Sequence, residues 1–365
     1  MMQSKIDSFI ILVDERNKDN HDYPVLGINK DKTFMPTAAN MEGIDTCKYK
    51  VVKKGTFVFS GMQTGRDMCI RIGLYDKDIP ALISPAYTTF VLDETKGVLP
   101  EYFFLTFNRE ESDRYGAFIS DSSVRANLDW NRFLDIEIPL PSLAEQQKVV
   151  NAWRALREIK EQNEAVAAPL MQVCQSYIQE LKHKYESVEI GPYIEEVDER
   201  NSDLIIKLSQ GIANTKVFQD PKQVSENSKS DKIVRHGYFG YNRATTRNGE
   251  KISIAYREGE DCTVSSAYGV FRIIDKNVLS PHFLWMWVSR PEFDRYARYM
   301  SKGSAHEFFD MDEMKRVRIP LPPLSVQQAI VNIYNCANEA KRIAAEADRM
   351  SREVCPALIQ HVIHY

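Results

Sequence analysis

The sequence lacks the patterns that mark most enzymes, secreted proteins and membrane proteins. No apolar run approaches the ~18 residues that a membrane-spanning helix needs, and the N-terminus does not resemble a signal peptide. The six cysteines are scattered without a Cys-x-x-Cys pair, which favours reduced thiols in a cytoplasm over disulfides or a zinc site. No Gly-x-x-x-x-Gly-Lys-Ser/Thr loop and no glycine-rich strand-to-helix turn is present, so neither ATP nor S-adenosylmethionine is expected on this chain.

An excess of positive charge is absent as well. The 365 residues carry a formal net charge of −4, so any surface that binds nucleic acid must be local. Contents of 43% hydrophobic and 27% charged residues are ordinary for a soluble globular protein. The length allows two or three domains, each with its own core.

What the sequence does contain is a segment that occurs twice. Residues 138–143 read Ile-Pro-Leu-Pro-Ser-Leu, and residues 319–324, which lie 181 positions later, read Ile-Pro-Leu-Pro-Pro-Leu; a Gln-Gln pair follows each. An ordered series of further matches, at offsets of 181 to 184, predicts two copies of one fold. These matches include residues 13–17 with 197–201, Gly27 with Gly211, Ser84 with Ser265, Arg109 with Arg290 and Asp113 with Asp294.

Each copy combines β-branched and aromatic runs, bounded by Gly and Asn, with short helical patterns, which predicts an α+β domain. Helices are expected from Pro100 and from Pro281, because proline suits the first helical turn. A second helix is expected to follow each of them. The predicted strands lie at 56–59, 68–72, 81–92 and 135–138 in the first copy, and at 238–241, 252–255, 262–274 and 316–319 in the second.

After each Pro-rich hinge the apolar spacing changes to about 3.5 residues, the pattern of a coiled-coil seam. Two long helices paired antiparallel are the simplest arrangement; the alternative is that each helix packs on its own domain. Pro169 and Pro356 are expected to kink or break these helices. The predicted apolar seam residues are Val149, Trp153, Leu156, Ala167, Leu170, Cys174, Tyr177 and Leu181, then Ile330, Ile333, Ala337, Ala340, Ala344, Ala347, Val354 and Leu358.

Two pairs of neighbouring carboxylates, Asp14-Glu15 and Asp198-Glu199, are the type of group that a metal-dependent nuclease uses. However, neighbouring residues on a strand point to opposite faces, and no Glu-x-Lys partner follows at close range. The sequence therefore favours turn chemistry, in which Asp or Asn bonds the backbone and a carboxylate pairs with a nearby Arg. No catalytic residue and no metal ligand is predicted.

Basic and amide side chains gather in two equivalent stretches, 48–71 and 233–257. Each contains a predicted hairpin loop, 60–66 or 242–249, with the Arg, Asn, Gln and Thr side chains that read base edges. Later loops at 122–125 and 301–306 could add phosphate or base contacts. Any one loop could be a solvated polar turn, but two equivalent loops with different residues favour DNA binding. The predicted DNA-binding residues are Lys53, Lys54, Gln63, Thr64, Arg66, Arg71, Arg125, Asn242, Arg243, Thr245, Thr246, Arg247, Lys251, Lys302 and Ser304.

The plan of a variable domain, an Ile-Pro-Leu-Pro-x-Leu-x-x-Gln-Gln hinge and a long helix, present twice, resembles the specificity (S) subunit of type I restriction-modification systems. The segments at Gly55 and Gly237 and the Ser-x-Ala-Tyr elements at Ser84 and Ser265 are similar to its target-recognition domains. The resemblance implies two pseudo-symmetric α/β target-recognition domains separated by two long antiparallel helices. The expected segments are 1–138 for the first domain, 139–186 for hinge and central spacer helix, 187–319 for the second domain, and 320–365 for hinge and C-terminal helix.

The same resemblance implies a non-catalytic subunit that reads a bipartite target in double-stranded DNA. Two methyltransferase (modification) subunits would dock on the helices, and restriction or motor subunits would complete the assembly. S-adenosylmethionine, ATP and Mg²⁺ would then belong to those partners, with no cofactor on this chain and no membrane involved. One departure is Val326, which stands in the second copy where the first has Glu145.

Three other functions remain open on the sequence. The chain could be the specificity subunit of a related phage-defence methyltransferase that lacks a nuclease. It could be a stand-alone DNA-modifying enzyme, although the missing catalytic motifs argue against this. It could also be a scaffold whose basic loops bind protein or RNA.

Overall fold

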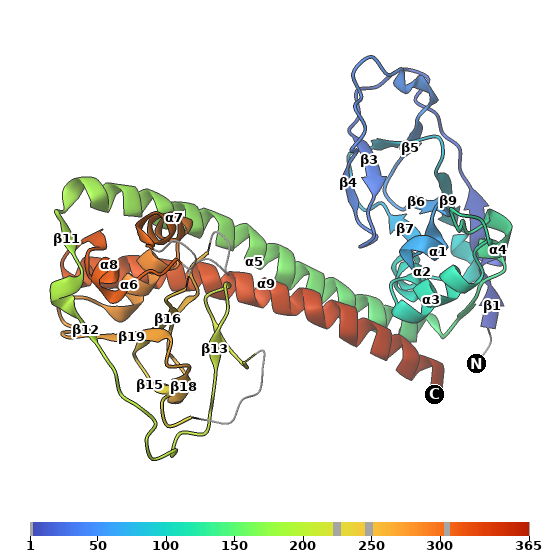
Figure 1. Ribbon diagram of the computed structural model, residues 1–365. Helices are drawn as coiled ribbons and strands as arrows, with labels where there is room; N and C mark the ends of the chain where they lie inside the picture. Colours follow the sequence, from blue (N-terminus) through green and yellow to red (C-terminus); the bar gives the residue numbers. More distant parts are fainter. Residues whose placement is uncertain (1–2, 222–227, 245–250, 303–306, 365) are drawn as a thin grey trace. The chain divides into compact units, whose positions relative to one another are not determined.

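The computed structural model describes residues 3–221, 228–244, 251–302 and 307–364. The chain forms two compact units (Figure 1). Unit 1 comprises Met1–Asn163 and Arg342–Tyr365, and unit 2 comprises Glu164–Lys341. Each unit therefore contains one globular domain together with parts of two long helices, α5 (Leu143–Lys184) and α9 (Leu324–His364).

The centre of unit 1 is an antiparallel four-stranded sheet with the strand order β2-β9-β6-β7. Because alternate side chains of a strand point to opposite faces, Phe57 and Phe59 pack with α2, whereas Val58 packs toward a second sheet. Phe57 stacks on Phe90 with ring centroids 5.0 Å apart. The elements of this part are β2 (Ile10–Leu12), β6 (Phe57–Ser60), β7 (Arg71–Leu74), β9 (Thr88–Leu92), α2 (Pro100–Phe107), α3 (Glu110–Phe118) and α4 (Trp130–Leu134).

The second sheet of unit 1 has the order β4-β3-β8-β5 and contains one parallel pair, β3 with β8. A separate pair joins β1 to β10, directly before the first hinge. The remaining elements are β1 (Gln3–Lys5), β3 (Val25–Ile28), β4 (Phe34–Pro36), β5 (Lys50–Val52), β8 (Ala81–Ile83), β10 (Glu137–Pro139), the short helix α1 (Thr64–Asp67), and 3-10 turns at Ile6–Phe9, Thr46–Lys48 and Glu94–Lys96.

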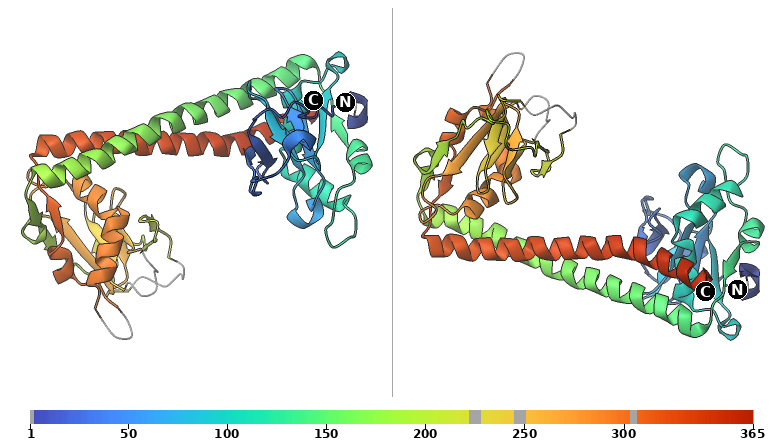
Figure 2. Two further views of the ribbon diagram at one scale, coloured as in Figure 1. Left: turned by 90° about the horizontal axis from the view of Figure 1, so that it is seen from above. Right: turned by 90° about the horizontal axis from the view of Figure 1, so that it is seen from below.

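Unit 2 repeats the plan. Its sheet has the order β12-β19-β16-β17, and Phe239 stacks on Phe271 as Phe57 does on Phe90, here with centroids 4.9 Å apart. Helices α6 and α7 lie beside this sheet (Figure 2). The elements are β11 (Ser187–Glu189), β12 (Ile194–Glu196), β13 (Gly211–Ile212), β14 (Phe218–Gln219), β15 (Lys232–Val234), β16 (Phe239–Asn242), β17 (Ile254–Tyr256), β18 (Cys262–Val264), β19 (Tyr268–Ile273), β20 (Arg318–Pro320), α6 (Pro281–Val288), α7 (Pro291–Met300), α8 (Met311–Lys315) and a 3-10 turn at Gly191–Tyr193.

These observations confirm the duplicated α+β fold. The predicted hairpins are present as the antiparallel pairs β6–β7 and β16–β17, and helices begin at Pro100 and Pro281 as expected. Of the helices in the described ranges, none combines the length and apolar character that crossing a bilayer requires.

The two long helices correct the predicted break at Pro169 and Pro356. Both are continuous, and each runs through its proline, Pro169 or Pro356, without a break. Proline removes one intrahelical hydrogen bond, and packing of flanking residues compensates: Ala167 is buried near the first proline, and Cys355 and Ile359 flank the second. Most predicted seam positions are buried or half-buried, but the side chain of Tyr177 faces solvent and its neighbour Ile178 is buried instead.

Within each unit the long helices pack against one another and run antiparallel. In unit 1, Val149 and Val150 of α5 share a core cluster with Cys355 and Ile359 of α9. Further along α5, Lys160 pairs with Asp348 at 2.7 Å. Later residues of α5 therefore lie beside earlier residues of α9, which shows that the two helices are antiparallel. In unit 2, one cluster contains Ile178 and Leu181 of α5 together with Ile330 and Val331 of α9.

One fully buried glutamine sits at each hinge. Gln146 accepts a hydrogen bond from the Leu99 amide and donates to the carbonyls of Gly97 and Pro141. Gln327 makes the equivalent three bonds, each 2.8 Å long, with the Ser280 amide and the carbonyls of Val278 and Pro322. The first residue of each Gln-Gln pair thus ties the start of a long helix to the segment before α2 or α6.

We expect Gln327→Leu to destabilise the protein, because it leaves one buried amide and two carbonyls without partners. A loss of about 2–4 kcal/mol in unfolding free energy is expected, since each unsatisfied buried group costs roughly 1–3 kcal/mol. Urea titration followed by circular dichroism measures it. The matched control is Gln328→Leu, whose exposed amide bonds only Asn332; equal losses in the two variants would contradict the role assigned to Gln327.

Candidate nucleic-acid interface

The repeated Asp-Glu-Arg-Asn segment has a structural role in both units. Asp14 pairs with Arg16 at 2.8 Å, and the hydrogen bond from Arg16 lowers the pKa of Asp14. The side chain of Asn17 both donates to and accepts from the backbone of His21. The turn contacts predicted for this segment are therefore present, and Asp198, Arg200 and Asn201 make the equivalent contacts in unit 2, where Asn201 bonds the backbone of Ile206.

The first predicted loop of unit 1 joins β6 to β7 and contains α1. Gln63 before this short helix and Met68 after it adopt left-handed backbone conformations, with φ of 58° and 51°. These two residues allow the chain to make a full turn between adjacent antiparallel strands. As a result Arg66 lies on the outer side of the turn, exposed to solvent.

The structure brings this loop together with the second predicted loop, which follows α3. The Leu128 amide donates to the Gly61 carbonyl at 2.8 Å, and the Gly65 amide donates to the Ala126 carbonyl at 2.9 Å. Glycine is required at position 61, because a Cβ there would lie 1.9 Å from the Leu128 carbonyl oxygen. We call residues 61–68 and 120–128 the loop pair of unit 1.

An equivalent contact occurs in unit 2. The Phe309 amide donates to the Arg243 carbonyl at 2.8 Å, at the positions that correspond to Leu128 and Gly61. Phe308 also exchanges backbone hydrogen bonds with Lys302. We call residues 242–251 and 301–309 the loop pair of unit 2, of which 245–250 and 303–306 lie outside the described residues.

The predicted DNA-binding cations fall into two groups. Five are ion-paired: Lys53 with Glu15, Lys54 with Asp78, Arg71 with Asp67, Arg243 with Asp310 and Lys302 with Glu313. Three others, Arg66, Arg125 and Lys251, are exposed and have no carboxylate within ion-pair distance in the described ranges. The unpaired group is the one whose charge is immediately available to a phosphate or a base.

The remaining predicted residues differ in their environment. Thr64 is a correction: its side chain is fully buried and its hydroxyl donates to the Gly61 carbonyl, because the loop uses it to close its own turn. The backbone amide of Gln63 donates to the side-chain oxygen of Asn127 in the second loop of unit 1. The side-chain oxygen of Asn242 accepts a hydrogen bond from the backbone amide of Ala244. Thr245, Thr246, Arg247 and Ser304 lie outside the described residues.

The sequence analysis did not predict a buried ion pair that supports the first loop of each unit on its inner side. Lys32 Nζ lies 2.7 Å from Asp113 of α3, and the same carboxylate accepts a hydrogen bond from the Ile70 amide at the end of the first loop. In unit 2, Lys216 lies 2.8 Å from Asp294, and burial lowers the pKa of Lys216. The aspartates were found as a repeat; Lys32 and Lys216 lie 184 positions apart, the offset of Gly27 and Gly211, so the same repeat was the signal that could have found them.

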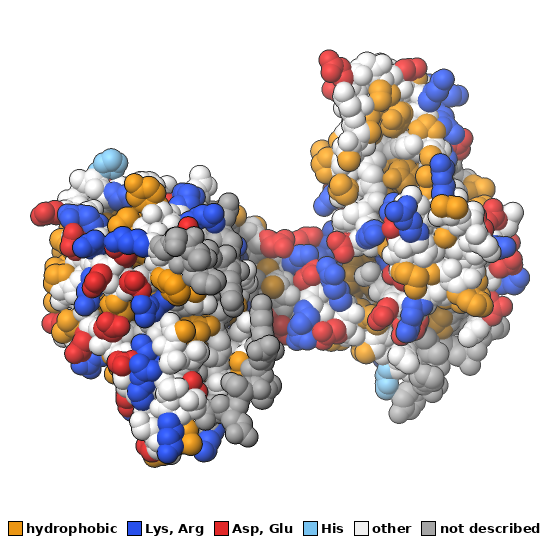
Figure 3. Space-filling view, in the orientation of Figure 1, with side chains coloured by type: hydrophobic (Ala, Val, Ile, Leu, Met, Phe, Trp, Pro, Cys, Tyr) orange, Lys and Arg blue, Asp and Glu red, His pale blue; other side chains and the backbone are white. Residues whose placement is uncertain are grey.

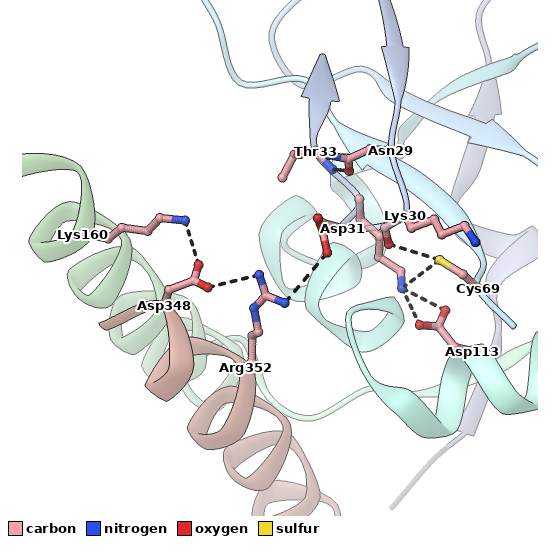
Figure 4. Close-up of polar contacts among 10 residues, drawn as sticks. Asn29, Lys30, Asp31, Thr33, Cys69, Asp113, Lys160, Asp348 and Arg352 are labelled. Carbon is pink, nitrogen blue, oxygen red and sulfur yellow. Dashed lines mark hydrogen bonds and ion pairs between the residues drawn. The ribbon is translucent and has the colours of Figure 1, made fainter. Parts of the chain in front are cut away.

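A chain of ion pairs connects the long helices of unit 1 to the same turn. Asp348 of α9 binds Lys160 of α5 and also Arg352, at 3.1 Å (Figure 4). Arg352 in turn lies 3.8 Å from Asp31, next to Lys32. The hydrogen bond from Lys160 lowers the pKa of Asp348. Polar groups thus link the helix pair, the β3–β4 turn and α3 within one unit.

No group of three or more His, Cys, Asp or Glu side chains suited to a metal ion occurs in the described part of the chain. The sequence matches the family model described as "Type I restriction modification DNA specificity domain" twice, over residues 8–166 and 179–335. The chain belongs to this family.

One solved structure of this kind shares the fold. The S subunit of a type I restriction-modification system from M. genitalium aligns with a TM-score of 0.66 and 11% sequence identity, over 99% of this chain and 95% of that one. The HsdS subunit from Thermoanaerobacter tengcongensis aligns with a TM-score of 0.40 and 16% identity, over 99% and 96% of the two chains. None of the curated proteins compared with the sequence matches it.

Gly61→Ala tests the loop contact. The added methyl group is expected to push the two loops apart and to cost roughly 1–3 kcal/mol, as overpacking does. Hydrogen exchange of the Leu128 amide, which is bonded to Gly61, should then become faster.

The control is Gly27→Ala, whose Cβ would meet the Tyr87 hydroxyl at 3.6 Å, an ordinary van der Waals distance. Unchanged exchange at Leu128 in the Gly61→Ala variant would show that the loops do not depend on this close approach.

Proposed function

We propose that the chain reads a bipartite target in double-stranded DNA and directs methyltransferase subunits to it. Each loop pair reads one half of the target, and the chain itself performs no catalysis. The two units carry equivalent frames with different loop residues, as expected of a protein that recognises two different short sequences. S-adenosylmethionine, ATP and Mg²⁺ belong to the partner subunits.

The observation that carries this proposal is the matching pair of backbone hydrogen bonds, Leu128 to Gly61 and Phe309 to Arg243. They join, in both units, two loops that are far apart in sequence and that the composition had singled out separately. Backbone contacts hold the frame without fixing which side chains it presents. A loop pair of this kind can therefore change its sequence, and with it the bases that it reads.

In unit 1 the residues proposed to contact DNA are the exposed Arg66 and Arg125, with Gln63 beside them. In unit 2 they are Lys251, Asn242, Arg243 and Lys302, together with Thr245, Thr246, Arg247 and Ser304 of the same loops. Ion pairing does not exclude Arg243, because its solvent-exposed pair with Asp310 contributes about 1 kcal/mol or less and can be exchanged for a phosphate contact. Lys302 pairs with the buried Glu313 but is itself 72% exposed, so it is proposed to contact a phosphate while keeping that pair. Lys53, Lys54 and Arg71 are proposed to act through the local positive potential.

We further propose that two methyltransferase subunits dock on α5 and α9, and that restriction or motor subunits join them in a complete assembly. Support comes from the family to which the chain belongs and from the duplicated helices, which provide two equivalent surfaces. The proposed segment boundaries are 1–138, 139–186, 187–319 and 320–365.

The deciding experiment is genome-wide mapping of methylated adenines in a host that carries the chain with its methyltransferase. We expect one motif made of two short specific halves around an unread gap. A single uninterrupted motif, or methylation that does not depend on the chain, would refute the proposal. Restriction of unmethylated phage DNA by the same host would show whether a nuclease accompanies it.

Substitutions in one loop pair should affect one half of the motif. Arg66→Ala or Arg125→Ala is expected to relax the half-motif read by unit 1 and to lower the methylation rate about tenfold or more, because a bidentate base contact contributes roughly 1–3 kcal/mol of discrimination. Lys251→Ala is expected to affect the other half.

The control is Lys96→Ala, which removes an exposed cation of unit 1 outside the loop pair. If Arg66→Ala and Lys96→Ala change methylation equally at both halves, the loop pair is not the reading surface.

A further inference from the structure

Each unit presents one aromatic side chain almost entirely to water, at the same place in the repeat. Phe118 ends α3 and is 84% exposed, and Tyr299, which lies 181 positions later in α7, is 86% exposed. Single exposed apolar residues are common and need no explanation on their own. Here, however, two exposed aromatic residues occupy the same position of the repeat, although the neighbouring loops have diverged. This conservation between the units indicates a contact that both units make.

A basic residue accompanies each ring. Arg114 and Arg295 precede the aromatic residues by four positions, so each lies one helical turn away on the same helix face. Within the part of the chain that the structure describes, they pair with Glu111 and Glu292 of the same helices, at 3.6 and 3.8 Å. The side chains of Arg114 and Arg295 are 62% and 72% exposed, so both guanidinium groups can bind a phosphate in addition.

The aromatic residues border the proposed reading surface. Phe118 precedes Ser120, which packs against Gly65 within the loop pair of unit 1. Tyr299 precedes Lys302, which bonds Phe308 within the loop pair of unit 2. Over α1 to α3, hydrophobic and basic side chains lie interspersed on the surface of unit 1 (Figure 3).

We propose that Phe118 and Tyr299 are sequence-independent DNA contacts, in which each ring packs against a nucleotide beside the bases that its own loop pair reads. Arg114 or Arg295 binds a phosphate of the same segment. Duplex DNA suits this surface because an exposed apolar ring can insert between neighbouring base steps and stack there, whatever the identity of the bases. A contact that ignores sequence explains why the position stays aromatic in both units while the loops differ.

The inference rests on the proposed function, and one binding assay tests both. The full chain, in complex with its methyltransferase subunits, is titrated with a fluorescent duplex that carries the mapped motif. Phe118→Ala and Tyr299→Ala are each expected to weaken binding on the order of tenfold, since loss of base–aromatic stacking has effects of that size. The methylated motif itself should stay the same, unlike in Arg66→Ala.

The chain supplies matched controls. Ile79→Ala in unit 1 and Ile205→Ala in unit 2 remove apolar side chains that are 70% and 73% exposed but lie outside the loop pairs, and both should bind as the wild type does. Phe118→Tyr and Tyr299→Phe, which exchange the residues of the two units, should also retain binding.

A photoreactive phenylalanine analogue at position 118 or 299 identifies the contacted molecule. Crosslinks to the duplex, each within one half of the motif, are expected. Crosslinks to the methyltransferase subunit instead, or alanine variants that bind within twofold of the wild type, would overturn the inference and leave the proposed function standing. A wild-type complex that does not bind the duplex would refute the proposed function and the inference with it.

Discussion

The structure depends on the hydrogen bonds of one buried glutamine at each hinge. Gln146 and Gln327 each use their side-chain amide to satisfy three backbone groups: one carbonyl of the proline-rich segment, and one amide and one carbonyl of the segment before α2 or α6. Proline cannot donate a backbone hydrogen bond, so these segments cannot be held by regular pairing alone. The glutamine fixes where the long helix leaves the globular domain, and thereby which residues of the helix face the seam and which face the domain.

A second constraint holds the candidate reading surface without specifying it. The loops of each unit are joined through backbone atoms, and the ion pairs Lys32–Asp113 and Lys216–Asp294 support them from the buried side. Side chains on the outer side of the loops take little part in either interaction. A duplicated gene product can therefore keep its fold while its two surfaces diverge.

Charge illustrates why composition alone misleads in this protein. The net charge is −4, and most predicted DNA-binding cations are neutralised locally by carboxylates such as Asp67, Asp310 and Glu313. Arg66 and Arg125, by contrast, come from different loops and lie in one loop pair. Because electrostatic attraction to DNA depends on such local clusters, the arrangement of a few residues matters more than the total.

The sequence by itself determined the duplication, the fold class, the hairpins, the start of the helices at Pro100 and Pro281, and the structural role of the Asp-Glu-Arg-Asn turns. These follow from local patterns: side-chain alternation, helical spacing, proline at a first turn and a constant offset between matching segments. Only the tertiary structure decided that the helices continue through Pro169 and Pro356, that Thr64 faces the interior, and that the two loops of each unit meet. Each of these depends on contacts between residues far apart in the chain, which supply packing or hydrogen bonds that no local pattern encodes.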